Sequence, residues 1–189
     1  MGALANKTAG VVDDVLDATV VLSFTSVGPA VRSRVQHWAP LPSMAGRRVV
    51  VTGANSGIGF AAARRCAELG ATVHLAVRDL ARGEDARRRI VQAHPAASVE
   101  VARLDAGDLG SVRAFAEGFR AAHDSLDVLV HNAGALLHER HETADGIETT
   151  LATHVVGPFL LTTLLLPVLE RSGAGRVITV TSGGMYTTG

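Results

Sequence analysis

The sequence is poor in several residue types, and each scarcity excludes a class of structure or partner. Its 189 residues include one cysteine, Cys66, so no disulfide can form within the chain, and this usage suits a reducing compartment. The 18 Lys and Arg residues balance the 18 Asp and Glu residues, and the basic ones are spread through predicted helices. Because nucleic-acid binding needs a concentrated basic face, we expect no nucleic-acid partner.

Signals for export and for membrane spanning are also lacking. Lys7 is the only early positive charge, and Asp13, Asp14 and Asp17 interrupt the stretch that a secretory signal would keep apolar. The longest later apolar run, Val155 to Leu169, is shorter than the ~20 residues that cross a bilayer, and it predicts a buried core helix. We therefore expect a cytoplasmic protein.

Apolar residues are nevertheless abundant, at 47% of the chain with a mean hydropathy of +0.24, and can bury a substantial core. Strand-like and helix-like segments alternate, as is typical of βαβ units. Strands are predicted at Arg48–Thr52, Thr72–Val77, Ser98–Arg103, Val128–His131 and Arg176–Thr181, and helices at Gly57–Leu69, Ala81–His94, Leu109–His123 and Gly146–Arg171. The predicted fold class is α/β, a Rossmann-type doubly wound parallel sheet with helices on both faces.

Residues 1–45 precede this unit and are interpreted as an N-terminal helical extension, with residues 46–189 as the Rossmann domain. The extension combines apolar positions with the basic segment "VRSRVQHW" and predicts an amphipathic helix packed on the main domain. Weak contact with a membrane surface is the alternative interpretation. The apolar positions are Val12, Val15, Leu16, Val20 and Leu22.

The stretch "TGANSGIG" joins the first predicted strand to the first predicted helix. In this setting Gly53 permits a tight turn, Gly57 lets backbone N–H groups approach a pyrophosphate, and Gly59 lets the helix pack closely. The helix N-terminus then faces the anion with its positive dipole end. A P-loop is disfavoured because Phe60 stands where a Lys-Ser/Thr pair would follow. The pattern therefore favours a dinucleotide site.

Arg78 follows the second predicted strand, about twenty residues beyond the glycine turn, where the ribose of a dinucleotide is read. A cation there matches the 2′-phosphate of NADP better than the 2′-hydroxyl of NAD. We expect NADP(H) as the preferred cofactor. The alternative is that Arg78 is solvated and that Asp79 holds the ribose, in which case NAD(H) binds.

Several motifs occur together in an order and spacing that resemble the short-chain dehydrogenase/reductase (SDR) family. They are "TGANSGIG", "HLAVRD", "RLDAGDLGSVRAF", "DVLVHNAG", "TADGIETTLATHVVGPFLLTTLLLP" and "RVITVTSGGM". The resemblance covers about residues 46 to 189. Including "FTSVGPAVRSRVQHW", the chain as a whole resembles bacterial relatives of dehydrogenase/reductase SDR family member 12.

The resemblance implies a role for individual positions. Ser56 and Ile58 join the three glycines in the turn that holds the pyrophosphate, and Asp105 takes the adenine amino group. Asn132, Ala133 and Gly134 support the sheet and the cofactor. Ser182 hydrogen-bonds the substrate oxygen. The alternatives are local: Asp105 or Asp108 caps the following helix, and Ser182 is one more hydroxyl at a strand end.

The implied chemistry is hydride transfer between nicotinamide and a carbonyl or secondary alcohol, with a proton relayed by a Tyr-x-x-x-Lys pair. Here the only lysine is Lys7, and the only tyrosine, Tyr186, lies too close to Ser182 to be the family's proton donor. The chain is interpreted as C-terminally incomplete, without the last strands, and we expect little or no dehydrogenase activity from it. His154 stands where a helix Asn joins the relay through a water, and it is a candidate proton carrier or, alternatively, a core histidine.

The predicted function is therefore that of an NADP(H)-preferring SDR oxidoreductase acting on a small-molecule carbonyl or alcohol, with a homo-oligomer as the family's usual state. One alternative is a non-catalytic nucleotide-binding Rossmann protein, and a weaker one is an SDR-like epimerase or dehydratase. No metal site is predicted. "HERHE" places His138 and His141 three residues apart, without the His-Glu-x-x-His spacing of a zinc helix.

Overall fold

A computed structural model of the protein describes residues 27–35, 39–135 and 137–181. The chain divides into two units, Met1–Pro42 and Ser43–Gly189. In the first unit, helix α3 spans Val27–Val35, where the hydroxyl of Ser33 donates to the carbonyl of Ala30. The apolar positions from Val12 to Leu22 lie outside the described residues, so the amphipathic character of the extension stays a prediction.

The second unit is built on a five-stranded sheet whose described strands are all parallel and follow the order β3-β2-β1-β4-β5. The strands are β1 (Arg48–Thr52), β2 (Thr72–Val77), β3 (Ser98–Arg103), β4 (Val128–His131) and β5 (Arg176–Thr179). The first four match the sequence prediction, but β5 ends two residues before the predicted Thr181. Its partner β4 ends at His131, opposite Thr179. The last hydrogen bond between the two strands runs from the Val180 N–H to the His131 carbonyl.

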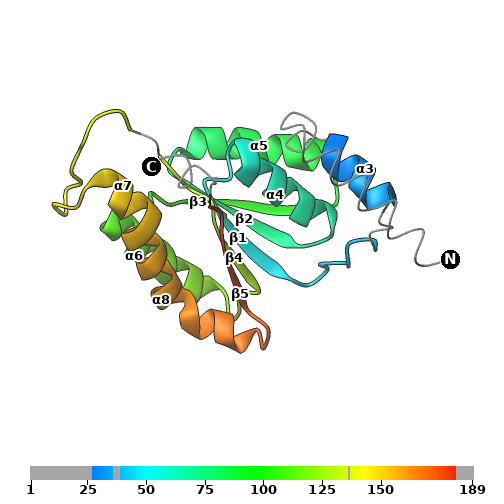
Figure 1. The fold of residues 1–189 in the computed structure, drawn as a ribbon. Coiled ribbons are helices and arrows are strands. Elements are labelled where there is room, and N and C mark those ends of the chain that lie inside the picture. The colour runs from blue at the N-terminus through cyan, green and yellow to red at the C-terminus, as the bar shows by residue number, and fades with distance from the viewer. Residues whose placement is uncertain (1–26, 36–38, 136, 182–189) are drawn as a thin grey trace, which may run out of the picture. The chain divides into compact units, whose positions relative to one another are not determined.

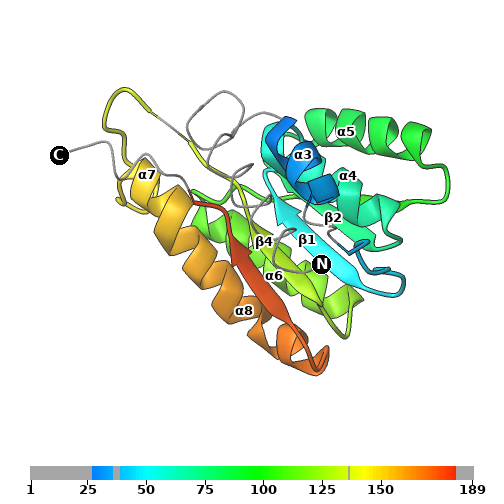
Figure 2. The ribbon, with the colours of Figure 1, turned by 45° about the vertical axis from the view of Figure 1, so that its right-hand side comes forward.

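Helices cover both faces of this sheet, as predicted (Figures 1 and 2). Helices α4 (Gly57–Glu68) and α5 (Leu80–Ala93) lie on one face, and α6 (Leu109–Ala122) and α8 (Gly157–Arg171) lie on the other. The side chains of β1 alternate accordingly. Val49 and Val51 join the core under α4 and α5, whereas Val50 joins the core under α6 and α8. The doubly wound Rossmann-type α/β fold is thereby confirmed.

The helix before β5 is continuous from Thr149 to Arg171 but irregular. It begins at α7 (Thr149–Leu151) rather than at the predicted Gly146, because the Glu148 carboxylate caps it by accepting from two N–H groups of that first turn. A π-helical segment, η1 (Ala152–Val156), then leads into α8.

This same helix is the one, among the described residues, that is long and apolar enough to cross a membrane. Length and composition alone do not separate a membrane span from a core helix. Here Leu161, Leu165, Val168 and Leu169 are buried in the core against α6 and the sheet, but only 28% of the most apolar 18-residue stretch is buried, so the prediction of a buried core helix holds for one face alone. On the opposite face, Phe159 is 73% exposed.

Candidate functional site

A cavity of about 590 Å³ opens at the carboxyl ends of the parallel strands. Its lining includes the residue after each of four strands: Gly53 after β1, Arg78 after β2, Leu104 after β3 and Asn132 after β4. The strand order reverses between β1 and β4, because the chain leaves β1 toward β2 and later returns to the other side of β1. Doubly wound sheets bind ligands at this switch point, so the cavity is the candidate site.

Two glycines of the turn after β1 are required by close approaches of the backbone. Gly53 has a φ of +66°, and a Cβ atom there would lie 2.9 Å from the Cα atom of Ala133. At Gly59, a Cβ atom would overlap the side-chain amide of Asn132 and lie 2.6 Å from the carbonyl oxygen of Gly53. Side chains at these positions would separate α4 and the turn from the loop after β4.

The remaining predicted residues of this turn lie at the N-terminus of α4. Ser56 lines the cavity, and its hydroxyl makes no capping hydrogen bond to the helix. Gly57 has a φ of +55° and open space where a Cβ atom would be, and Ile58 is 69% exposed. Gly57, Ile58 and Gly59 do not line the cavity wall. The unpaired N–H groups of a helix N-terminus and the free hydroxyl fit an anionic pyrophosphate.

The loop after β4 is fixed to the end of β1 by a group of hydrogen bonds. The backbone N–H groups of Asn132 and Ala133 both donate to the Thr52 hydroxyl, at 3.0 and 2.9 Å. The Asn132 side chain donates to the carbonyls of Thr52 and Gly53, at 3.0 and 3.3 Å. Asn132, Ala133 and Gly134 therefore line the cavity as one rigid edge, and Thr52, which the sequence did not single out, anchors it.

Arg78 lines the cavity at the end of β2 and is exposed. It has no ion pair or hydrogen bond with any residue that the structure describes. The neighbouring carboxylate of Asp79 is occupied, because it caps α5 by accepting from the Arg82 N–H at 3.1 Å and lies 3.6 Å from the Arg82 side chain. The cavity wall therefore presents two guanidinium groups, of which Arg78 has no acidic partner among the described residues.

Asp105 and Asp108, the two carboxylates after β3, make different hydrogen bonds. Asp108 caps α6 by accepting from the Ser111 N–H at 3.0 Å. Asp105 instead accepts from the N–H of Gly107 within its own turn, while the Asp105 N–H donates to the Ser111 hydroxyl. Both line the cavity, and the capping of α6 belongs to Asp108, so the adenine role of Asp105 stays a prediction.

His154 lies in the π-helical segment and is exposed, so it is not a core histidine. Its Nε2 atom is 3.0 Å from both the backbone nitrogen and the carbonyl oxygen of Ala135. A Cβ atom at Gly134 would lie 3.0 Å from the His154 ring. His154 does not line the cavity itself; it contacts the loop that does. π-Helical turns are frequent at functional sites.

One predicted position, Ser182, lies outside the described residues, and three histidines do not line the cavity. Ser182 is among the residues that the structure does not describe, so its catalytic role stays a prediction. His138 and His141 of the "HERHE" segment are exposed. His131 is buried at the end of β4, with its Nε2 atom 2.8 Å from the Thr162 hydroxyl, and burial lowers its pKa to about 4.

The cavity also contains residues that the sequence did not single out. Those from the loop before α7 and from α7 to η1 are polar or small, and no motif spacing distinguishes them from an ordinary surface loop. A signal was available for Asn55, which lies within the glycine turn itself. The residues from these segments are Asn55, Thr143, Ala144, Asp145, Thr149 and Thr153, and the others are Arg82, Leu104, Ala106, Gly107, Ala135 and Leu137.

Comparisons with known proteins agree with this geometry. A family model described as short chain dehydrogenase matches residues 47–187. Retinol dehydrogenase 12 of Bos taurus is 47% identical over 137 residues, which cover 72% of this chain and 43% of that protein. Dehydrogenase/reductase SDR family member 12 of Homo sapiens is 44% identical over 140 residues, 74% of this chain and 44% of that protein. The chain thus spans less than half the length of these curated relatives.

A solved structure is also similar. The crystal structure of a metagenomic short-chain oxidoreductase in complex with NADP is 33% identical, with a TM-score of 0.65. The match covers 74% of this chain and 63% of that one.

Proposed function

The chain belongs to the short-chain dehydrogenase family, and on that premise we propose that it binds NADP(H) in the switch-point cavity for hydride transfer to or from a carbonyl or secondary alcohol. The cofactor, when bound, supplies the hydride acceptor or donor. The protein's part is to hold the cofactor and the substrate together and to exclude competing reactions.

The preference for NADP(H) rests on one observation, the free guanidinium of Arg78 beside the occupied carboxylate of Asp79. Asp79 is committed to the N-terminus of α5 and to the Arg82 side chain, so it is poorly placed to hold a ribose hydroxyl. Arg78 has no acidic partner among the described residues and lines the cavity. A guanidinium forms strong, charge-assisted hydrogen bonds with a phosphate group. The NADP in the related metagenomic structure supports the same assignment.

The residues of the cavity would divide the binding of the dinucleotide between them. Ser56, Gly57 and Ile58 at the N-terminus of α4 would meet the pyrophosphate. Asp105 would accept from the adenine amino group, and the edge made by Asn132, Ala133 and Gly134 would face the nicotinamide half. We further assign Ser182 to the substrate oxygen and His154 to the position of the family's helix Asn. The Tyr-x-x-x-Lys pair is not among residues 1–189.

A parallel titration with NADPH and NADH tests this proposal. The wild-type chain should bind NADPH more tightly than NADH, and Arg78→Ala should weaken NADPH binding by roughly 10- to 100-fold, since a hydrogen bond to a charged group contributes about 1.5–3 kcal/mol. NADH binding should change little. Arg88→Ala is the matched control, because Arg88 is a nearby arginine within α5 that pairs with Asp85 and does not line the cavity. Equal affinity for both nucleotides in the wild-type chain would refute the preference.

A further inference from the structure

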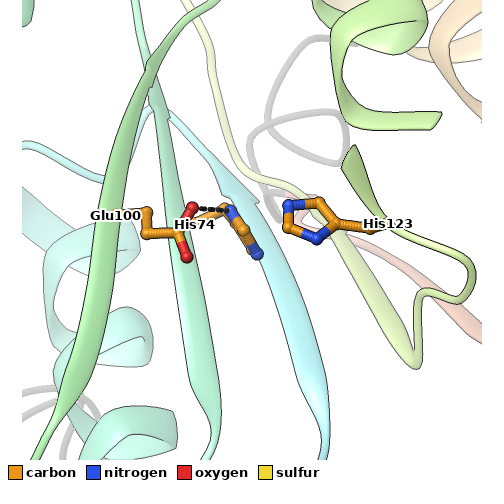
Figure 3. A group of neighbouring side chains, drawn as sticks. All are labelled: His74, Glu100 and His123. Carbon is orange, nitrogen blue, oxygen red and sulfur yellow. Dashed lines mark ion pairs between the residues drawn. The ribbon is translucent and has the colours of Figure 1, made fainter. Parts of the chain in front are cut away.

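Three side chains with metal-ligating atoms meet on the sheet face that α6 covers, away from the cofactor cavity. His74 lies on β2, Glu100 lies directly opposite it on β3, and His123 is the C-terminal cap of α6. One ligand atom from each lies within 4.8 Å of the other two. The Nδ1 atom of His74 is 3.4 Å from a Glu100 carboxylate oxygen, and Figure 3 shows His74 between Glu100 and the His123 ring.

The most buried member of this group, His74, has one ring nitrogen without a hydrogen-bond partner. His74 is 3% exposed, and its Nε2 atom is buried without a hydrogen-bond partner. A buried polar atom without a partner loses its hydrogen bonds to water without replacing them, so its presence requires an explanation. The rings of His74 and His123 are 4.8 Å apart and inclined by 61°, and Figure 3 shows the His123 ring with one of its nitrogens turned toward His74.

The chemistry of these donors suits a transition-metal ion. The cluster offers two imidazole rings and one carboxylate, and one ligand atom from each lies within 4.8 Å of the other two. Imidazole nitrogen and carboxylate oxygen are both common ligands of divalent transition metals.

We propose that His74, Glu100 and His123 bind a divalent transition-metal ion of the zinc class and thereby clamp the C-terminus of α6 to strands β2 and β3. Two histidines and one glutamate form a known three-ligand set for zinc, with a water molecule at the fourth position. Ca²⁺ and Mg²⁺ prefer sites made of oxygen ligands alone, so two imidazole ligands favour a transition-metal ion over either of them.

Binding requires a small rearrangement, and two of the three ligands can make it. Zinc bonds of about 2.0–2.2 Å in a tetrahedral site place ligand atoms roughly 3.3 Å apart, closer than the widest separation here. His74 is fixed in the core. The side chain of Glu100 is 55% exposed and His123 is half-buried at a helix end, so both can close on His74 by rotating. Their exposure also gives the ion a path of entry from solvent.

Two neighbouring side chains affect how well the cluster can hold a cation: Phe119 favours binding by shielding the site, and Arg48 opposes it by its positive charge. Phe119 closes the site toward the core, with its ring 5.1 Å from that of His74 and 4.7 Å from that of His123. Arg48 is near enough for its positive charge to lower the pKa of both histidines. Its Nη1 atom donates to the Ser125 carbonyl at 2.9 Å, and this hydrogen bond keeps the positive charge beside the cluster. We therefore expect modest affinity rather than the tight binding of a closed structural site.

Calorimetric titration of the chelator-treated chain with Zn²⁺ tests the proposal. We expect one saturable site and a rise in the thermal unfolding temperature, because an ion that binds only the folded state stabilises it. Glu100→Gln and His123→Gln should each weaken Zn²⁺ binding at least about tenfold and abolish the rise in temperature. With Co²⁺ in place of Zn²⁺, the visible absorption of a low-coordinate ion should appear in the wild-type chain and disappear in both variants.

The matched control is His94→Gln. His94 is the C-terminal cap of α5 as His123 is of α6, and each donates its N–H to the fourth residue before it, but His94 is outside the cluster. It should leave Zn²⁺ binding unchanged. The proposal is overturned if the wild-type chain shows no saturable binding, or if His94→Gln weakens binding as much as His123→Gln. Circular dichroism of each variant verifies that folding is intact, so that lost binding is not mistaken for unfolding.

Discussion

The side-chain amide of Asn132 fills the space in which any residue other than glycine at position 59 would place its Cβ atom. The same amide donates to the carbonyls of Thr52 and Gly53, so it stands at the junction of β1, α4 and the loop after β4. The third glycine of "TGANSGIG" and the asparagine of "HNAG" are thus two sides of a single contact. This contact sets the distance between the helix N-terminus and the far edge of the cavity.

Gly59→Ala should therefore disrupt cofactor binding. The added methyl group must displace the Asn132 amide, which breaks its bonds to Thr52 and Gly53 and moves the cavity edge. We expect a loss of at least tenfold in NADPH affinity together with destabilisation of about 1–3 kcal/mol, measured by nucleotide titration and by urea unfolding. Gly118→Ala in α6 is the control, since a Cβ atom there meets nothing within 4 Å. It should be neutral or stabilise the helix by up to about 1 kcal/mol.

The sequence was sufficient for the sheet and for the part of the cavity at the strand ends because both depend on local patterns. Strands and helices are indicated by short apolar runs and by apolar residues at helical spacing, and parallel strands connected by helices follow from the crossover rule. Gly53, Arg78 and Asn132 directly follow strands and Asp105 comes two residues after one, so a parallel sheet brings them to one edge. The contact between Gly59 and Asn132 joins residues from separate motifs, and no spacing within either motif reveals it.

His154 offers a second test, because it holds the cavity loop from outside. Its Nε2 atom contacts the Ala135 backbone at 3.0 Å. His154→Leu removes this hydrogen bond and should weaken NADPH binding about fivefold, since such a bond contributes about 1 kcal/mol. His154→Gln, whose amide reaches a similar distance, should restore most of the affinity. If leucine and glutamine behave alike in the titration, His154 does not position this loop.

The irregular helix shows what local patterns could not supply. Pro158 has no N–H group to donate to the carbonyl of His154, four residues earlier, as an ordinary α-helix requires. The chain instead forms a π-helical turn in which the Gly157 N–H donates to the Ala152 carbonyl. This turn brings His154 to the loop after β4. The proline was visible in the sequence, but whether it would kink the helix, end it or produce a π turn depends on packing against Ala106 and the sheet.

Acid should destabilise the protein through His131. Its pKa of about 4 in the folded chain is below the ordinary value of 6.5. Between these values the unfolded chain binds more protons than the folded chain, so the free energy of unfolding falls as the pH drops from 6.5 toward 4 and this loss levels off below about 4. The contribution of His131 reaches at most roughly 3 kcal/mol. His74 contributes in the same direction.

The substitution His131→Asn separates the contribution of His131 to acid destabilisation from that of His74. Asparagine does not titrate, so urea unfolding at a series of pH values should give a visibly smaller slope between pH 6.5 and pH 4 than in the wild-type chain. His138→Asn, at an exposed position, should leave the slope unchanged. An unaltered slope in His131→Asn would mean that folding does not lower the pKa of this imidazole.

We expect residues 1–189 to bind the cofactor without catalysing its oxidation by a carbonyl compound. These residues contain the cavity and the glycine turn but no lysine four positions after a tyrosine, the arrangement that lowers a tyrosine pKa for proton transfer in the family. Purified chain should bind NADPH and, with a carbonyl compound present, consume it no faster than a protein-free control, as measured by absorbance. Tyr186→Phe should change neither result. Turnover that depends on Tyr186 would make that tyrosine the proton donor, and it would show that a lysine partner is dispensable in this protein.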